Sequence, residues 1–245
     1  MRYYAFTILE YRATMLPANR YLASVVSNHQ CRMLALISQK GGSGKTTLAL
    51  HLAVIAQEAG LRTLLVDCDP QRSVAGWWRA RAAAAPELVE TTPDQLRTVL
   101  EAAQADGVAL IVVDTRPSVE RDTAEVARVA DFSLIPTRPS ILDLRAIGAT
   151  VDVIKALNRP AAIILNACPA PRGAGEASVT VEARRGLLAY GLPIASQAVT
   201  VRAALAHALI DGRAVTEFEP DGKAAGELRR VWKWTEHLLW PNAQA

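Results

Sequence analysis

Residues 40–47 read Lys-Gly-Gly-Ser-Gly-Lys-Thr-Thr, and this stretch constrains the fold more than any other. A short apolar run at residues 33–38 precedes it, and residues 48–56 follow with a helical pattern. A glycine-rich loop between a buried strand and a helix predicts a phosphate cradle. Its backbone N–H groups can turn toward phosphate oxygens, and the helix N-terminus adds partial positive charge. In such a loop we expect Lys45 to reach the β- and γ-phosphates and the Thr46 hydroxyl to bind Mg²⁺.

The loop departs from the ordinary P-loop pattern at its first position. That pattern, G-x-x-x-x-G-K-[ST], requires glycine at position 39, where this chain has Gln39 followed by a second lysine, Lys40. The loop resembles instead the deviant Walker A signature KGGxGK[ST] of the ParA/MinD family of ATPases. The resemblance implies ATP and Mg²⁺ as cofactors. The residues that would hold the nucleotide are Gly41, Gly42, Ser43, Gly44, Lys45, Thr46 and Thr47.

Length and composition allow one large α/β domain or two small ones. Half of the 245 residues are apolar (51%), enough for a substantial core. The three cysteines, Cys31, Cys68 and Cys168, are scattered, and no secretory signal precedes them. This usage predicts reduced thiols and a cytoplasmic location. No apolar run approaches the roughly 18 residues of a membrane span.

The net charge of +3 does not support a basic nucleic-acid-binding domain. Residues 1–32 carry four arginines and one glutamate, which leaves 23 basic and 23 acidic side chains in the remaining 213 residues. Any contact with nucleic acid must therefore come from a local basic cluster.

Residues 1–32 differ in kind from the rest of the chain. They hold four of the five tyrosines and show neither a sustained period nor a glycine loop. They are too few for a helix-turn-helix domain, and their interrupted apolar stretches do not look like a signal peptide. Two interpretations are open, an N-terminal arm or translation that begins at Met33, and we favour the second. We expect residues 33–245 to form the ATPase domain.

Two predicted strands end in carboxylates. Residues 62–69 end in Asp67-Cys-Asp69, and the very apolar residues 109–114 end in Asp114. Ligands of open parallel sheets bind outside the carboxyl ends of the strands, so these side chains should meet the cradle at one edge. A hydrophobic strand that ends in aspartate is the Walker B pattern, which holds a carboxylate near Mg²⁺.

The residues around these carboxylates resemble further motifs of the ParA/MinD family. Asp-Cys-Asp-Pro-Gln at 67–71 resembles its DxDPQ motif, which implies that Asp69 orients or activates the attacking water and that Asp67 supports the Mg²⁺ shell. Asp114-Thr-Arg-Pro resembles its D-T-P-P, with Arg116 in place of the first proline. Two interpretations of Arg116 stay open: contact with phosphate or an opposing subunit, and an ordinary solvated side chain.

Strand and helix patterns alternate along the rest of the chain. Further strands are predicted at residues 87–90, 132–136, 161–166 and 194–200. The alternation predicts one doubly wound, mostly parallel α/β sheet flanked by helices, as in P-loop NTPases. Asn166 stands where the ParA/MinD family has an asparagine that reads adenine.

The last predicted helix spans about residues 223–240. Its apolar residues recur on one face and predict packing on the sheet. Family dimers bind DNA nonspecifically through basic residues near the C-terminus, and contacts of this kind with phosphate weaken steeply with salt. The candidates by this resemblance are Arg202, Arg229, Arg230 and Lys233. The alternative is a solvated charged face, because Glu227 and Glu236 are interspersed.

The resemblance covers residues 33 to about 240 and implies a short ParA-type partitioning ATPase. Two subunits would close on ATP into a homodimer in which Lys40 reaches the partner's phosphates, with Lys45 and Asp69 completing the catalytic set. The dimer would bind DNA, and a small centromere-binding adaptor would stimulate hydrolysis, so the protein would be nucleoid-associated.

The alternative function is a MinD-like or conjugation-type positioning ATPase that acts at the membrane or on another cargo. The tryptophans and basic residues of the last helix keep membrane attachment open. The tail after that helix is too short to add an anchor. We therefore expect no stable membrane anchor.

Overall fold

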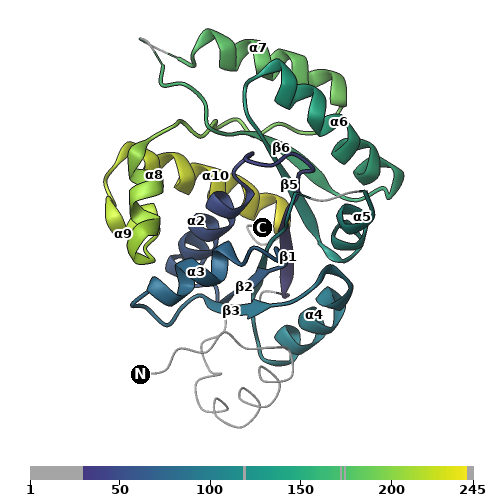
Figure 1. The fold of residues 1–245 in the computed structure, drawn as a ribbon, viewed down its shortest axis with the longest axis vertical. Helices are drawn as coiled ribbons and strands as arrows, with labels where there is room; N and C mark the ends of the chain where they lie inside the picture. Colours follow the sequence, from purple (N-terminus) through teal and green to yellow (C-terminus); the bar gives the residue numbers. More distant parts are fainter. Residues whose placement is uncertain (1–29, 118–119, 172, 174, 242–245) are drawn as a thin grey trace.

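The centre of the molecule is a six-stranded sheet with helices on both faces (Figure 1). The computed structural model describes residues 30–117, 120–171, 173 and 175–241. All neighbouring strands pair in parallel, in the order β3-β2-β4-β1-β5-β6. The strands are β1 (Arg32–Leu36), β2 (Thr63–Asp67), β3 (Glu87–Glu90), β4 (Leu110–Asp114), β5 (Phe132–Thr137) and β6 (Ala161–Leu165). The predicted doubly wound parallel sheet is confirmed.

Side chains that alternate along each strand divide the core into two layers. In β1, Leu34 and Leu36 join one hydrophobic cluster, whereas Met33 and Ala35 join the other. This is the period of two that a strand covered on both faces must have. The strands consequently read as almost continuous apolar runs, which is why they could be recognised in the sequence.

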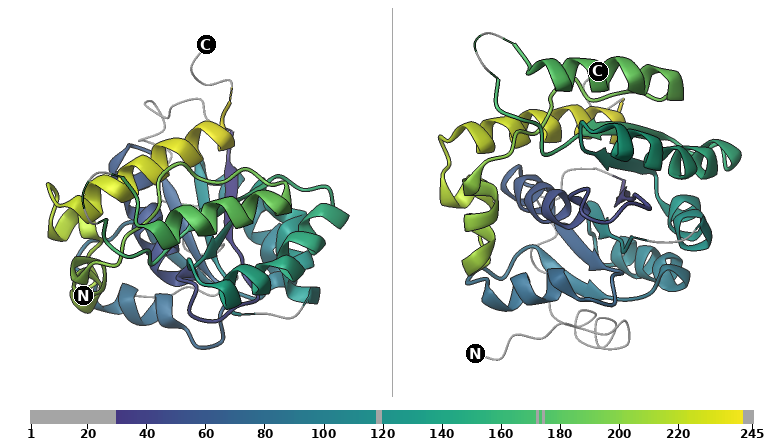
Figure 2. Two further views of the ribbon diagram at one scale, coloured as in Figure 1. Left: turned by 90° about the horizontal axis from the view of Figure 1, so that it is seen from above. Right: turned by 45° about the horizontal axis from the view of Figure 1, so that its top comes forward.

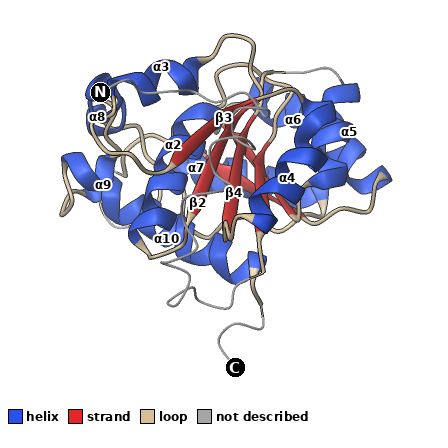
Figure 3. Cartoon of the chain, turned by 90° about the horizontal axis from the view of Figure 1, so that it is seen from below, coloured by secondary structure: helices blue, strands red, loops and turns tan. Residues whose placement is uncertain are grey.

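The two clusters are covered by two sets of helices on opposite faces of the sheet, and Figure 3 shows most of each set on opposite sides of the red strands. One set comprises α2 (Lys45–Glu58), α3 (Ser73–Ala80), α8 (Ala203–Ala208), α9 (Val215–Phe218) and α10 (Lys223–Leu239). The other comprises α4 (Leu96–Ala105), α5 (Glu120–Val129), α6 (Ile141–Ala156) and α7 (Ser178–Leu187). Short 3₁₀ helices lie at Pro93–Gln95, Leu188–Tyr190 and Leu209–Asp211.

The apolar face of α10 belongs to the core. Leu228, Val231 and Trp232 are buried together with residues of α2 and of the sheet, and Figure 2 shows α10 in yellow beside α2. The predicted packing of this helix is confirmed. A face already buried against α2 is not available to a lipid surface, which argues against membrane attachment through α10. Among the described residues, no helix combines the length and the apolar character needed to cross a membrane.

The prediction of a last strand at residues 194–200 is wrong. The segment runs beside β6 and forms two isolated bridges, between Ile163 and Ile194 and between Cys168 and Thr200. Backbone hydrogen bonds accompany them, such as those from Ala195 to the carbonyl of Ile163 at 2.8 Å and from Val199 to the carbonyl of Leu165 at 2.9 Å. Between the bridges the chain bends, and the Gln197 side chain donates to the carbonyl of Ala198. The segment is therefore paired near its two ends and bent in the middle, and it does not form a continuous strand.

The described residues that precede Met33 contact later parts of the chain. Strand β1 begins at Arg32, whose guanidinium pairs with Asp131 at 2.8 Å, and the indole of Trp240 donates to the carbonyl of Gln30 at 3.1 Å. Residues 30–32 thus belong to the domain. Residues 1–29 lie outside the described residues, so the choice between an arm and a start at Met33 stays a prediction.

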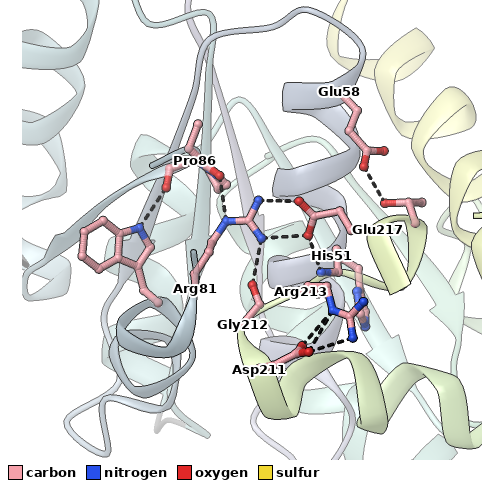
Figure 4. Close-up of polar contacts among 12 residues, drawn as sticks. His51, Glu58, Arg81, Pro86, Asp211, Gly212, Arg213 and Glu217 are labelled. Carbon is pink, nitrogen blue, oxygen red and sulfur yellow. Dashed lines mark hydrogen bonds and ion pairs between the residues drawn. The ribbon is translucent and has the colours of Figure 1, made fainter. Parts of the chain in front are cut away.

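A buried arginine joins α3 to the segment that leads into α9 (Figure 4). Arg81 is 5% exposed and pairs with both carboxylate oxygens of Glu217, at 2.7 and 2.8 Å. It also donates to the carbonyls of Ala85 and Gly212, at 2.7 and 2.8 Å. A bidentate ion pair of this kind fixes the position of α3 relative to α9, because separating the two side chains would leave a buried charge without a partner.

Helix α9 is held to α2 as well. The backbone N–H of Val215 donates to Nδ1 of His51 at 3.1 Å, and the Thr216 hydroxyl donates to Glu58 at 3.0 Å. Burial lowers the pKa of His51 to about 4, so the imidazole is neutral and can accept that bond. Helix α9 therefore connects α2 and α3, the two helices that follow the glycine-rich loop and Asp69.

Candidate functional site

The predicted site residues gather at the carboxyl edge of the sheet. The loop 37–44 connects β1 to α2, and β1 lies between β4 and β5. The helices that follow β4 and β5 cover the opposite face from α2. Ligands of open α/β sheets bind at such a point, where neighbouring connections leave toward opposite faces.

The end of the loop is shaped by Gly44 and Asn166. Gly44 has φ +95°, and a Cβ built on it would lie 2.0 Å from the Asn166 amide nitrogen. That nitrogen donates to the carbonyl of Ser43 at 2.8 Å. Position 44 therefore requires glycine both for its backbone conformation and for this close approach. The sequence placed Asn166 at the nucleotide edge but did not reveal that it holds the loop, and its contact with adenine stays a prediction.

Lys45 is the first residue of α2 and is 5% exposed. Burial lowers the pKa of its ammonium group, while Asp114 and Asp69 act in the opposite direction. The Nζ atom makes a long contact of 3.4 Å with the carbonyl of Lys40. A buried ammonium group with one weak hydrogen bond at a helix N-terminus is suited to bind an anion.

Thr46 and Asp114 bring the two nucleotide motifs together. The Thr46 hydroxyl donates to one carboxylate oxygen of Asp114 at 2.7 Å, although the residues are 68 positions apart. Asp114 is fully buried, and burial raises the pKa of its carboxyl group to about 7. Its other oxygen has no hydrogen-bond partner among the described residues. The contact places the aspartate at the end of β4 against the loop, whereas its role in holding Mg²⁺ stays a prediction.

Asp67 and Asp69 lie at the end of the neighbouring strand, but in different surroundings. Asp67 is buried and accepts the backbone N–H groups of Asp69 at 2.9 Å and of Ala75 at 3.3 Å. Asp69 is half-buried and accepts the N–H of Gln71 at 2.9 Å. Asp67 thus fixes the turn into α3, whereas Asp69 keeps access to the edge of the site.

These residues fit a nucleotide complex with Mg²⁺. In the described ranges, the buried hydroxyl of Ser43 and one oxygen of Asp114 lack partners, and both belong to this edge. No group of three or more histidine, cysteine, aspartate or glutamate side chains able to hold a metal ion occurs there. Mg²⁺ takes one or two protein ligands and completes its shell with phosphate and water. Thr46 and Asp114 are the residues placed to hold it.

Lys40 and Arg116 flank the site with different surroundings. Lys40 is exposed, and no ion pair engages its ammonium group within the described part of the chain. Arg116 follows β4, and its guanidinium pairs with Asp122. The free charge of Lys40 is consistent with a contact outside its own subunit, whereas the charge of Arg116 is already compensated.

The four DNA-binding candidates do not form one surface. Arg229, Arg230 and Lys233 are exposed on α10. Arg202 instead pairs at 2.7 Å with Glu227, a carboxylate that is 6% exposed and also accepts both the backbone N–H and the hydroxyl of Thr200. Glu227 is therefore not part of a solvated face, and Arg202 is poorly placed to contact DNA.

One cation at the site was not among the predicted residues. The guanidinium of Arg138, just after β5, lies against the loop. Its Nη2 atom is 3.4 Å from the place where a Cβ on Gly42 would be. Its position after a parallel strand, at the edge where ligands bind, is the signal that could have identified it.

Comparison with known proteins places the chain among nucleotide-binding domains. The model of the family described as "CobQ/CobB/MinD/ParA nucleotide binding domain" matches residues 34–215. This range contains the loop, the three aspartates and Asn166.

Curated relatives fall into two groups by coverage. "Maintenance of carboxysome distribution protein A" is 36% identical in Gloeobacter kilaueensis, over 82% of this chain and 92% of the relative. The protein of that name in Halothiobacillus neapolitanus is 30% identical, over 84% and 97%. "Chromosome-partitioning ATPase Soj" of Thermus thermophilus is 29% identical, over 51% of this chain and 63% of the relative.

Solved structures share the fold at low sequence identity. McdA of Cyanothece in its apo form superposes with a TM-score of 0.70 at 14% identity, over 83% of this chain and 98% of the other. An ATP complex of a variant of that protein gives 0.68 at 14%, over 86% and 97%. MinD of Pyrococcus horikoshii with Mg-ADP gives 0.68 at 18%, over 88% and 100%.

Proposed function

The chain belongs to the CobQ/CobB/MinD/ParA family of nucleotide-binding domains, and on this premise we propose that it is an ATPase that positions a cellular cargo. The observation that carries the proposal is the hydrogen bond between Thr46 and Asp114, next to the buried Lys45. It joins the phosphate loop to the Walker B strand in the arrangement that phosphoryl transfer requires.

Each residue of the loop has a role that its surroundings support. Lys45 binds the phosphate chain, and the turn of residues 41–44 presents backbone N–H groups to phosphate oxygens. Thr46 and Asp114 hold Mg²⁺, which neutralises charge on the phosphates when it is bound. The amide nitrogen of Asn166 holds the loop in its binding shape through the carbonyl of Ser43. The rest of the Asn166 amide group contacts adenine.

Asp69 is the residue we assign to the attacking water. It stands beside the buried Asp67 but is half-exposed, and it lies close enough to Lys45 to affect its pKa. A carboxylate in this place can accept a hydrogen bond from water and orient its oxygen toward the γ-phosphorus. A bond then forms from that oxygen to phosphorus as the bond to the bridging oxygen of ADP breaks, and phosphate is released.

Lys40 makes dimerisation part of the active site. Its ammonium group is exposed at the rim of the loop, where a second subunit would bring its own nucleotide. In a closed dimer this charge is desolvated and stabilises negative charge on the partner's phosphates. ATP binding and hydrolysis then switch the protein between a dimer and separate subunits.

The relatives favour a protein assembly as the cargo. Two relatives that are at least 30% identical and cover more than four fifths of this chain are named for the distribution of carboxysomes, whereas the chromosome-partitioning relative covers about half. We propose that the ATP-bound dimer associates with the nucleoid through Arg229, Arg230 and Lys233. An adaptor on the cargo then stimulates hydrolysis. DNA segregation with a centromere-binding adaptor is the second candidate, which the chromosome-partitioning relative favours.

Light scattering tests the dimer. The wild-type protein should be dimeric with ATP and Mg²⁺ and monomeric with ADP. Lys40→Ala should bind ATP but stay monomeric, and an ATP-dependent dimer of this variant would contradict the role of Lys40. Asp69→Ala should remain a dimer with ATP because hydrolysis stops, and normal turnover would contradict the role of Asp69.

Retention on DNA tests the proposed surface. A nonspecific duplex should be retarded with ATP but not with ADP, and high salt should abolish the retardation. Replacing Arg229, Arg230 and Lys233 together with glutamine should remove it without loss of ATPase activity. Unchanged retardation would exclude α10 as the DNA contact.

Deletion of the gene in the host cell tests the cargo. A protein compartment that becomes scattered, with plasmids and chromosomes still inherited normally, would identify that compartment as the cargo.

A further inference from the structure

Arg138 is held rigidly at the rim of the phosphate loop. It follows the last residue of β5, Thr137, which pairs with Leu165 and accepts the backbone N–H of Asn166 at 2.8 Å. The carbonyl of Arg138 accepts the N–H of Ser140 at 2.9 Å, and Ser140 caps α6 through the N–H of Asp143. Its backbone is thus fixed between the sheet and a helix N-terminus.

The side chain of Arg138 lies beside the middle of the loop. Its Nη2 atom lies 3.4 Å from the Cβ position of Gly42, while Asn166 contacts the loop at Ser43 and Gly44. Both contacts come from the β5–β6 side of the sheet. The Thr46–Asp114 pair stands on the other side of β1, at the end of β4. A phosphate chain in the loop would therefore lie between Mg²⁺-binding residues and a guanidinium.

The charge of Arg138 is uncompensated in the described part of the chain. The residue is exposed, and no carboxylate there lies within 4.0 Å of its guanidinium nitrogens. Arg116, at the corresponding place after β4, pairs with Asp122. A guanidinium that rests on a phosphate loop without an acidic partner is suited to phosphate oxygens, which its planar donors can bind in pairs.

We propose that Arg138 binds the phosphate chain of the nucleotide held by its own subunit, as a third cation beside Lys45 and the partner's Lys40. The inference rests on the proposed ATPase function, which it deepens. An Mg²⁺–ATP complex retains negative charge, and Arg138 approaches it from the side that lacks a metal ligand. The contact strengthens with each added phosphate, so it favours ATP over ADP.

Equilibrium binding measures this contact without relying on turnover. Calorimetric titration of Arg138→Gln with Mg²⁺–ATP should show a Kd about tenfold higher than that of the wild type, and a smaller increase for ADP. The binding of adenosine should not change. The Kd of Arg138→Gln for ATP should also depend less on salt than that of the wild type. The Kd of Arg138→Lys for ATP should lie between those of Arg138→Gln and the wild type. The matched control is Arg185→Gln, the same charge change at an exposed position of α7, which should bind all three ligands as the wild type does.

Three results would overturn the inference. Equal losses for ATP and adenosine would show that Arg138 only shapes the loop. An effect that disappears in a Lys40→Ala background, where the dimer does not form, would assign the contact to the partner subunit. Wild-type affinity for ATP in Arg138→Gln would exclude any contact. If the wild-type protein itself binds no ATP, the proposed function fails instead, so the two failures are distinguishable. Unchanged thermal melting of each variant verifies that it is folded.

Discussion

The two sides of the phosphate loop have opposite chemistry. On the side of β2 and β4, Asp67, Asp69 and Asp114 converge, and burial raises the pKa of Asp67 and Asp114. On the side of β5 and β6 stand Arg138, which lies beside Gly42, and Asn166, which is bonded to Ser43. One side is acidic and incompletely satisfied, whereas the other carries a guanidinium that is unpaired among the described residues and an amide that is bonded to the loop.

The difference shows which part of the site depends on its ligand. The acidic side places negative charges close together without enough hydrogen bonds, an arrangement that costs stability until a cation binds. On the other side, Asn166 bonds the loop within the chain and shapes it in advance. We infer that the acidic side performs the chemistry and that the opposite side sets the affinity for phosphate. Substitutions on the two sides should therefore have different effects.

The largest effect is expected on the acidic side. Asp114→Asn should lower Mg²⁺-dependent ATP turnover about a hundredfold or more, because it removes the charge opposite Thr46 that holds the metal ion. Binding of ATP in the presence of a chelator should change little. Steady-state phosphate release measures the effect, with Asp122→Asn as the control because Asp122 pairs with the exposed Arg116. Turnover within threefold of the wild type would contradict the division between the two sides.

The same substitution should make the ligand-free protein more stable. The pKa of Asp114 in the folded protein, about 7, exceeds the ordinary 3.8, so the folded state binds more protons between these values. Stability without ligand should therefore fall as pH rises from about 4 to 7. At pH 8, the free energy of unfolding of Asp114→Asn should exceed that of the wild type by about 2 kcal/mol. The pKa difference alone would give about twice this value at 1.36 kcal/mol per pKa unit, but the substitution also removes the negative charge beside Lys45. Denaturant titration at pH 4 and pH 8 measures this, and a less stable variant at pH 8 would refute it.

A substitution on the opposite side should act on stability in the other direction. Asn166→Ala removes a buried hydrogen bond to Ser43 and should cost about 1 kcal/mol of unfolding free energy. The affinity for ATP should fall about tenfold because the loop loses its shape, whereas turnover at saturating ATP should stay within twofold of the wild type. Gln104→Ala, at an exposed position of α4, is the control. A large loss of turnover at saturation would place Asn166 with the catalytic residues.

The smallest effect is expected at Arg116. Its guanidinium is half-exposed and paired with Asp122, and exposed ion pairs contribute about 0–1 kcal/mol. Arg116→Gln should therefore change the Kd for ATP and the turnover less than twofold. A tenfold loss of affinity would show that Arg116 leaves Asp122 to bind phosphate, and the contrast with Arg138 would no longer hold.

Residues that follow a local pattern were predictable from the sequence. Apolar strands ending in Asp67 and Asp114 indicated which side chains would meet at one edge, because parallel strands end together. The contact of Thr46 with Asp114 confirms that reasoning. The helical period after Leu228 likewise predicted which face of α10 is buried.

Contacts between distant side chains were not predictable in this way. Nothing near Arg81 in the sequence indicates that its partner is Glu217, 136 positions away. In the sequence, Glu227 is one charged residue of an amphipathic helix, and only the structure shows that it bonds Thr200 and Arg202. The missed contact of Arg138 with the loop is of the same kind. The failed strand at 194–200 is another case, since the apolar pattern gave no sign that the chain bends between the bridges at Ile194 and Thr200.

Calorimetric titration with ATP and Mg²⁺ tests the central claim, that residues 40–47 bind a nucleotide. The wild-type protein should bind one ATP per chain, and Lys45→Ala, which removes the buried ammonium group at the start of α2, should show no measurable binding. Equal affinity of the two proteins for ATP would contradict the assignment of the loop.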